Sequence, residues 1–162
     1  MENIKLQDVF RLLASIVACQ CAGLIGSVFT MPAIPTWYAA LQKPFFTPPN
    51  WLFAPAWATL YLLMGISAFI IWRRGLSDKP VREALFIFGV QLVINALWSV
   101  VFFGLKSPLS GIIVIVALWI AILYTMYKFY KLSPVAALLL IPYILWVSFA
   151  AGLNVSIWLL NP

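Results

Sequence analysis

The chain has 162 residues, of which 65% are hydrophobic and only 9% are charged, whereas a soluble domain carries roughly a quarter charged residues. This composition excludes a soluble fold and predicts an all-α integral membrane protein that forms one domain over residues 1–162. The net charge of +6 does not indicate nucleic-acid binding, because the basic residues flank hydrophobic segments. We therefore expect the lipid bilayer as a partner and no nucleic acid.

Charged residues divide the chain into five hydrophobic segments. A charged side chain at the centre of a bilayer costs about 3 kcal/mol on insertion scales, so uncharged intervals mark the membrane spans. Each interval holds the roughly 20 residues that a transmembrane helix requires. We predict a five-helix bundle with a long structured first loop, with helices over about residues 12–31, 51–73, 82–104, 108–128 and 134–159.

The basic residues are distributed unevenly between the two sides of such a protein. Lys43 and Lys106 fall on one side, and the other side holds Lys5, Arg11, Arg73, Arg74, Lys79, Arg82, Lys128 and Lys131. By the positive-inside rule, the N-terminus is cytoplasmic and the C-terminus lies outside, in a plasma or inner membrane. The apolar run after Arg11 is long enough to span and lacks a small-residue cleavage site, so we expect the first helix to be retained.

The first predicted helix carries a small residue at every fourth position, at Ala14, Ala18, Ala22 and Gly26. Such a ridge lets another helix approach closely in a membrane. We favour packing inside the bundle over a dimer seam, and a homodimer stays open. Cys19 and Cys21 lie about 200° apart around the helix, so they cannot form a disulfide with each other.

Residues 32–50 join the first two helices and are rich in proline and aromatic side chains. The prolines restrict the backbone and the aromatic rings provide surface to bury, which favours an ordered lid over a ligand pocket. The alternative is that Trp37 and Tyr38 only anchor the chain at the membrane interface. The second helix begins either at Asn50, a good N-cap, or at Pro55, a good first-turn residue.

Two predicted helices carry aromatic faces that we expect to meet. On the second helix this face consists, at helical spacing, of Trp57, Tyr61, Met64 and Ala68. On the fifth helix it consists of Trp146, Ala150 and Leu153. Pro142 precedes the second of these faces and is expected to kink the fifth helix.

The third helix places amide groups inside hydrocarbon, because Gln91 and Asn95 lie one turn apart. Buried amides require hydrogen-bond partners, which are either neighbouring helices or a bound ligand, and the sequence leaves both open. The fourth and fifth helices begin at Ser107 and Ser133, where a hydroxyl cap precedes a proline.

Several kinds of chemistry are missing from the sequence. The chain contains no histidine, and no carboxylate lies inside a predicted span, which excludes clustered metal ligands, a Ser-His-Asp triad and an intramembrane proton relay. No glycine-rich phosphate loop is present. A tryptophan-rich, weakly polar interior remains, which suits a flat hydrophobic ligand such as a porphyrin or a drug, with a sterol as the next candidate. An amide such as Asn95 can orient a carbonyl or carboxylate of that ligand.

Several separate motifs resemble one known family. They are WYAALQKP at residues 37–44, PPNW at 48–51, PAW at 55–57, QLVIN at 91–95, FFG at 102–104 and PYILW at 142–146, followed by Phe149-Ala150 and Leu153-Asn154. In order and spacing they resemble the TspO/MBR family of tryptophan-rich sensory proteins and translocator proteins. The likeness covers nearly all of the chain beyond its first twenty or so residues.

The resemblance implies a five-helix membrane protein, often dimeric, whose first loop covers a pocket for porphyrins and benzodiazepine-type drugs. No cofactor is required, and protoporphyrin IX is the implied ligand. The implied ligand-binding residues are Tyr38, Phe53, Ala54, Trp57, Asn95, Trp146, Ala150 and Leu153. We interpret the protein first as a non-enzymatic receptor or sensor. The alternatives are light-dependent porphyrin oxidation at Trp57 and Trp146, which the resemblance implies for bacterial relatives, and translocation of hydrophobic ligands.

The chain departs from the animal members of this family at two places. Their sterol motif on the fifth helix requires a tyrosine and an arginine where this chain has Val155 and Leu159, so we do not expect sterol recognition there. Ser110 stands where a tryptophan helps to line the animal drug pocket, which predicts weaker drug binding.

Overall fold

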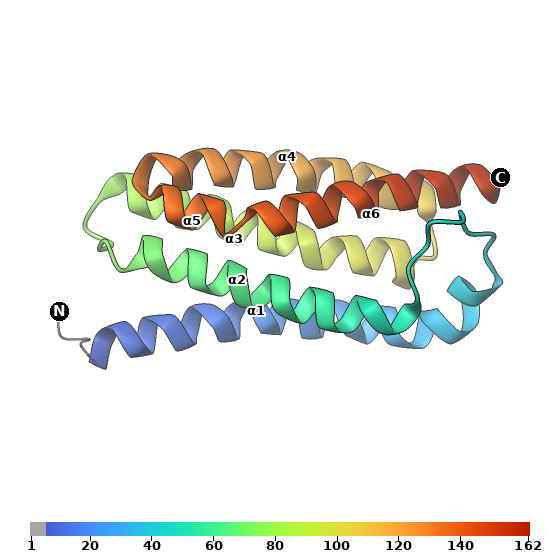
Figure 1. The fold of residues 1–162 in the computed structure, drawn as a ribbon, viewed down its shortest axis with the longest axis horizontal. Helices are drawn as coiled ribbons and strands as arrows, with labels where there is room; N and C mark the ends of the chain where they lie inside the picture. The colour runs from blue at the N-terminus through green and yellow to red at the C-terminus, as the bar shows by residue number, and fades with distance from the viewer. Residues whose placement is uncertain (1–5) are drawn as a thin grey trace.

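The computed structural model describes residues 6–162 and shows long helices that run side by side in one bundle (Figure 1). The helices are α1 (Leu6–Ala33), α2 (Phe53–Trp72), α3 (Lys79–Ser99), α4 (Pro108–Leu132), α5 (Pro134–Leu138) and α6 (Ile141–Leu160). Five segments are long and apolar enough to cross a membrane, and α5 with α6 forms the fifth. Residues 6–162 contain no strand, so the predicted all-α membrane fold is confirmed.

The helices pack in a ring around a common core. Helix α1 contacts α2 and α3, α4 contacts α3 and α6, and α2 contacts α5 and, more sparsely, α6. Part of the small-residue ridge on α1 lies inside this packing, because Ala22 and Gly26 are buried. A Cβ atom added at Gly26 would lie 3.0 Å from the Ser99 hydroxyl on α3. Ala18 is exposed, so the ridge is not buried along its whole length.

Local sequence signals fix most of the helix ends. Ser107 and Ser133 cap α4 and α5 as predicted, since each side-chain oxygen accepts a hydrogen bond from the backbone amide three residues later, at 3.3 Å and 3.4 Å. Asn50 makes no side-chain cap; it begins a short 3-10 turn that leads into α2. The fifth span is interrupted at residues 139–140, directly before Pro142. Because proline has no N–H to continue the helical ladder, the predicted kink is confirmed there.

Two helices continue into wider π-helical turns, which the sequence did not reveal. Helix α1 begins earlier than expected and runs past Pro32 into the turn Ile34–Tyr38. Helix α3 runs into the turn Val100–Gly104. Pro32 and Pro35 each remove a backbone donor from the α-helical ladder, and a change to wider hydrogen-bonded turns accommodates that loss. The first turn carries Tyr38 to a buried position.

The two ends of the bundle differ in charge, and the start of α1 lies at the opposite end from the C-terminus (Figure 1). At the end where α1 begins, Asp8 pairs with Arg73 at 3.5 Å and Glu83 pairs with Lys128 at 3.3 Å. We call this the charged end. The opposite end carries residues 34–49, which we call the lid, and is therefore named the lid end. Lys5, which contributes to the predicted charge asymmetry, lies outside the described residues.

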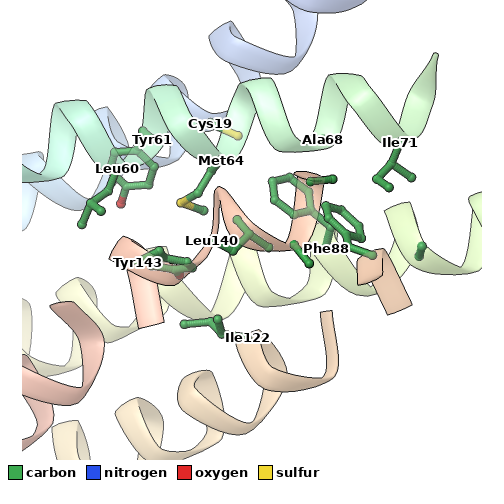
Figure 2. Packing of buried hydrophobic residues seen from close by; sticks show 14 of the residues in the cluster. Cys19, Leu60, Tyr61, Met64, Ala68, Ile71, Phe88, Ile122, Leu140 and Tyr143 are labelled. Atoms are coloured by element: carbon green, nitrogen blue, oxygen red, sulfur yellow. The ribbon is translucent and has the colours of Figure 1, made fainter. Parts of the chain in front are cut away.

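A dense hydrophobic core fills the half of the bundle nearer the charged end. Figure 2 shows side chains from several helices that meet there. Met64, Ile71, Ile122 and Leu140 are each at most 1% exposed, so water and lipid are excluded from the interior of this half. These residues form a rigid base for the more open half at the lid end.

Candidate ligand pocket

A cavity of about 330 Å³ lies in the lid-end half of the bundle, between α1, α2, α3 and α6. Its volume is at the lower end of the roughly 300–1,000 Å³ that is typical of small-molecule sites. Aromatic and aliphatic side chains dominate its wall, and among them are Tyr38, Phe53, Ala54, Trp57, Trp98, Phe102, Trp146, Ala150 and Leu153. The cavity is therefore suited to an apolar ligand.

Indole rings from two different helices face this cavity. Trp57 on α2 stacks on Tyr61, with ring centroids 5.5 Å apart and planes inclined by 28°. Trp146 on α6 meets Phe53 of α2 edge-on, with ring centroids 6.1 Å apart. Residues of both predicted faces thus line one cavity, while the ring that contacts Trp146 is Phe53, which was not part of the predicted face.

The lid is held over the cavity by aromatic packing. Tyr38 is only 4% exposed and packs against Phe103, with ring centroids 5.7 Å apart. Trp37 meets Phe102 edge-on at 5.5 Å. The Lys43 ammonium lies 5.0 Å from the centre of the Tyr38 ring and donates a hydrogen bond to the Leu41 carbonyl at 3.2 Å. The lid is consequently an ordered structure, which agrees with the interpretation of its prolines and aromatic residues.

A second attachment joins the lid to the far end of the chain. The Asn161 side chain accepts a hydrogen bond from the Gln42 amide at 3.0 Å and donates one to the Gln42 carbonyl at 2.9 Å. It also donates to the Ile157 carbonyl of α6 at 2.8 Å. We call this arrangement the Asn161 latch, because it binds the lid to the end of α6.

Seven of the eight predicted ligand-binding residues line the cavity; they are Tyr38, Phe53, Ala54, Trp57, Trp146, Ala150 and Leu153. Asn95 does not, and it is only 2% exposed. Its Oδ1 accepts a hydrogen bond from the Tyr61 hydroxyl, and its Nδ2 donates one to the Tyr143 hydroxyl at 2.9 Å. Of the two roles left open for this amide, the structure supports bonding between helices.

The hydrogen bonds of Asn95 belong to a buried network that lies below the cavity. The Tyr143 hydroxyl donates to Gln91 Oε1 at 2.9 Å, so the network links α2, α3 and α6. Tyr61 belongs both to this network and to the cavity wall. The network therefore fixes the ring on which Trp57 stacks.

Sequence reasoning missed the contribution of the first helix to the cavity. Gly23, Ser27 and Thr30 of α1 line it, together with Trp98 and Asn154 from other helices. These three residues follow one another at helical spacing on α1, on the side of the helix next to the predicted small-residue ridge. A stripe of glycine and hydroxyl residues is the signal that would have found them.

The cavity offers few polar groups. Trp146 Nε1 is a buried donor with no hydrogen-bond partner in the part of the chain that the structure describes. The Asn154 side chain is already bonded, to the Trp98 indole at 3.2 Å and to the Pro108 carbonyl at 2.9 Å. Residues 6–162 hold no group of His, Cys, Asp and Glu that could bind a metal ion. The site can thus enclose and stack an apolar ligand, with few polar groups on its wall to orient it.

Five membrane-spanning helices and an apolar aromatic cavity define a class of integral membrane proteins, and they are consistent with interaction with hydrophobic ligands. Comparison with known proteins is more specific, because the TspO/MBR family model matches residues 15–159. The chain belongs to this family, which supports a role in sensing or translocation at a membrane.

Its relatives come from all three domains of life. The chain is 48% identical over 155 residues to the tryptophan-rich protein TspO of Archaeoglobus fulgidus, which covers 95% of this chain and 99% of that protein. It is 34% identical over 149 residues to the tryptophan-rich sensory protein of Cereibacter sphaeroides, with 92% and 90% covered. It is 35% identical over 136 residues to the human translocator protein, with 83% and 80% covered.

Proposed function

We propose that the protein is a membrane receptor or sensor that binds porphyrin-type tetrapyrroles, with protoporphyrin IX as the reference ligand. The observation that carries this proposal is that two indoles from different helices, Trp57 of α2 and Trp146 of α6, line one apolar cavity. A planar macrocycle offers two faces, and indole rings stack favourably on such faces. Tyr38 closes the cavity from the lid side.

The cavity wall carries few polar groups, so stacking and burial are expected to hold the ligand more than hydrogen bonds do. The Trp146 N–H lacks a partner within residues 6–162, but its nitrogen is buried and is not open to the cavity. The pocket requires no resident cofactor to bind a tetrapyrrole in this way.

A titration with protoporphyrin in the dark tests the proposal. We expect saturable binding by the purified protein in detergent. Each stacked indole contributes about 0.5–1.5 kcal/mol beyond simple burial, so changing Trp57→Ala and Trp146→Ala together should raise Kd about 5- to 150-fold. Trp72→Ala, at the other end of α2, is the control and should leave Kd unchanged. Binding that never saturates, or that survives the double substitution, would contradict a defined site.

Light-dependent oxidation of the bound porphyrin is a second candidate function. It is favoured by the stacking of Trp57 on Tyr61, which places two oxidisable rings at the cavity wall. In this reaction dissolved dioxygen is the oxidant and the porphyrin is oxidised. The same titrated sample is illuminated and its porphyrin absorbance is followed. Loss of absorbance that requires light and disappears when both tryptophans are changed to Phe supports the enzyme; stable absorbance supports the receptor.

The orientation of the protein follows from its charge distribution. We infer that the charged end faces the cytoplasm and the lid end faces outward, because Arg73, Lys79 and Lys128 are among the basic residues gathered at the charged end. A cysteine placed at exposed Phe45 in the lid should react with a membrane-impermeant maleimide added to intact cells. Reaction only after the cells are opened would reverse this orientation.

A further inference from the structure

Helices α1 and α2 are in close contact where two glycines permit it. A Cβ atom added at Gly65 of α2 would lie 2.7 Å from Ile16 Cα of α1. One added at Gly23 of α1 would lie 2.4 Å from the Tyr61 ring of α2. From the Gly65–Ile16 contact to the Gly23–Tyr61 contact, α1 and α2 therefore lie too close together to admit a ligand between them.

Nearer the lid, the facing side chains are too short to fill the space between the same helices. Helix α2 presents Ala54 and Ala58, and both are exposed. Helix α1 presents Ser27, whose hydroxyl donates to the Leu24 carbonyl of its own helix at 2.7 Å. The Gln20 side chain does reach across, and donates to the Ala58 carbonyl at 3.1 Å. This hydrogen bond marks the edge of the gap on the side of the charged end.

Residues along this gap belong to the cavity wall and to the outer surface at the same time. Leu24 and Met31 of α1 line the cavity, yet they are 64% and 70% exposed. Ala54 and Ala58 line it from the opposite side. The cavity is therefore continuous with the surroundings of the protein between α1 and α2. Since both helices span the membrane, those surroundings are lipid hydrocarbon.

We propose that this gap is a lateral portal, formed by Ser27, Ala54 and Ala58, through which hydrophobic ligands enter the pocket directly from the bilayer. Entry from the aqueous side would require the lid to open. That movement breaks the packing of Tyr38 and both hydrogen bonds between Asn161 and Gln42. Entry through the portal breaks none of these contacts. Apolar ligands also concentrate in the bilayer, because water excludes them.

The inference concerns the route to the pocket and rests on the proposed function only for the choice of protoporphyrin as probe. Pyrene, an apolar fluorophore without porphyrin chemistry, serves as a second probe. If protoporphyrin fails to saturate the wild-type protein, the proposed function fails, and the portal is then judged on the exchange of pyrene alone. The two failures are thus distinguishable.

Two neighbouring substitutions on α1 test the portal. Ser27→Trp places an indole in the gap, whereas Val28→Trp places one on the adjacent lipid-facing surface, where Val28 is 68% exposed. With the protein in nanodiscs, stopped-flow measurement should show that Ser27→Trp slows both association and dissociation about tenfold, equivalent to about 1.4 kcal/mol of added barrier. Val28→Trp should leave both rates near those of the wild type. Faster dissociation with Ser27→Trp would mean damage to the site and would overturn the assignment.

Closing the lid covalently provides the complementary test. Gln42→Cys and Asn161→Cys in a Cys21→Ala background allow a reducible bifunctional thiol reagent to cross-link the latch, where the Asn161 side chain bonds to the Gln42 backbone. The remaining Cys19 is fully buried. If ligands enter through the portal, the cross-linked protein exchanges protoporphyrin or pyrene at the rate of the reduced protein. If cross-linking stops exchange, the lid is the entrance and the portal is excluded.

Discussion

The charged-end half and the lid-end half of the bundle use the same helices but differ in packing. In the charged-end half, Gly65 brings α1 against α2 and side chains such as Met64 fill the remaining space. In the lid-end half, Ala54 and Ala58 face the same neighbour without filling the gap, and a cavity of about 330 Å³ remains. Small residues therefore have opposite effects in the two halves. Gly65 allows α1 and α2 to make close contact, whereas Ala54 and Ala58 are too short to fill the space between the same helices. Hydrophobicity does not separate the two halves; packing density does.

The boundary between the halves is polar. Tyr61 and Tyr143 approach Asn95 from two different helices, and both hydroxyls bond to its amide. Such bonds between membrane helices contribute modestly, about 0.6 kcal/mol each on average, but they specify one arrangement of the groups they join. The network therefore fixes the positions of the side chains at the inner end of the cavity, but it adds little to the stability of the packed half.

The largest effect is expected from filling space in the packed half. Gly65→Ala places a methyl group 2.7 Å from the Ile16 backbone, which has to move, and overpacking of this kind costs about 1–3 kcal/mol. Gly152→Ala is the matched control, since Gly152 lies in α6 and the added Cβ would meet no neighbouring side chain or other helix within 4 Å. Helix propensity favours alanine over glycine by up to about 1 kcal/mol, so the control should be neutral or stabilising.

Thermal unfolding in detergent measures both variants. We expect Gly65→Ala to lower Tm and Gly152→Ala to leave it unchanged or raise it. Equal effects of the two substitutions would show that the contact between α1 and α2 is loose, and the contrast between the two halves would be lost.

A smaller effect is expected at the polar boundary. Asn95→Leu leaves two buried phenol hydroxyls with fewer partners, which should cost about 1–2 kcal/mol of unfolding free energy. Gln91→Met removes only one accepted bond, and the Gln91 Nε2 atom already lacks a partner among residues 6–162. It should therefore cost less than Asn95→Leu. If Gln91→Met lowers the free energy of unfolding more than Asn95→Leu does, this order is wrong.

Because Tyr61 supports Trp57, Asn95→Leu should also weaken porphyrin binding, although Asn95 does not line the pocket.

Much of the scaffold could be predicted from the sequence because the bilayer imposes strong rules. Uncharged intervals predicted five spans, hydroxyl caps predicted the starts at Ser107 and Ser133, and Pro142 predicted the break before α6. These features depend on single residues or on composition. The π-helical turn Ile34–Tyr38 was missed because prolines usually end a helix, and only tertiary packing of Tyr38 reveals why the chain continues to coil.

The pocket was predicted less completely than the scaffold. Aromatic residues at helical spacing on two spans, with the family resemblance, located Trp57 and Trp146. The side of α1 that lines the cavity was not found, because Gly23 and Ser27 resemble ordinary packing residues in the sequence. Asn95 was placed among the ligand-binding residues by the family resemblance, while the buried amide by itself left ligand and helix partners both open. Its actual partners, Tyr61 and Tyr143, come from other helices, and a single sequence does not reveal such pairs.

The smallest effect on global stability is expected at the Asn161 latch, and it sharpens the contrast between the halves. Asn161→Ala removes two exposed hydrogen bonds to Gln42, but water replaces them and the opening is local to the lid, so the core near Met64 is untouched and global stability changes little. Tm should change by less than it does in Gly65→Ala. Because local opening precedes exchange, the Gln42 amide should exchange with deuterium several-fold faster, as measured by NMR. Asn161→Asp keeps the acceptor for this amide and should show an intermediate rate. A fall in Tm as large as that of Gly65→Ala would mean that the lid belongs to the packed scaffold, and the lid-end half would then be open only toward the bilayer.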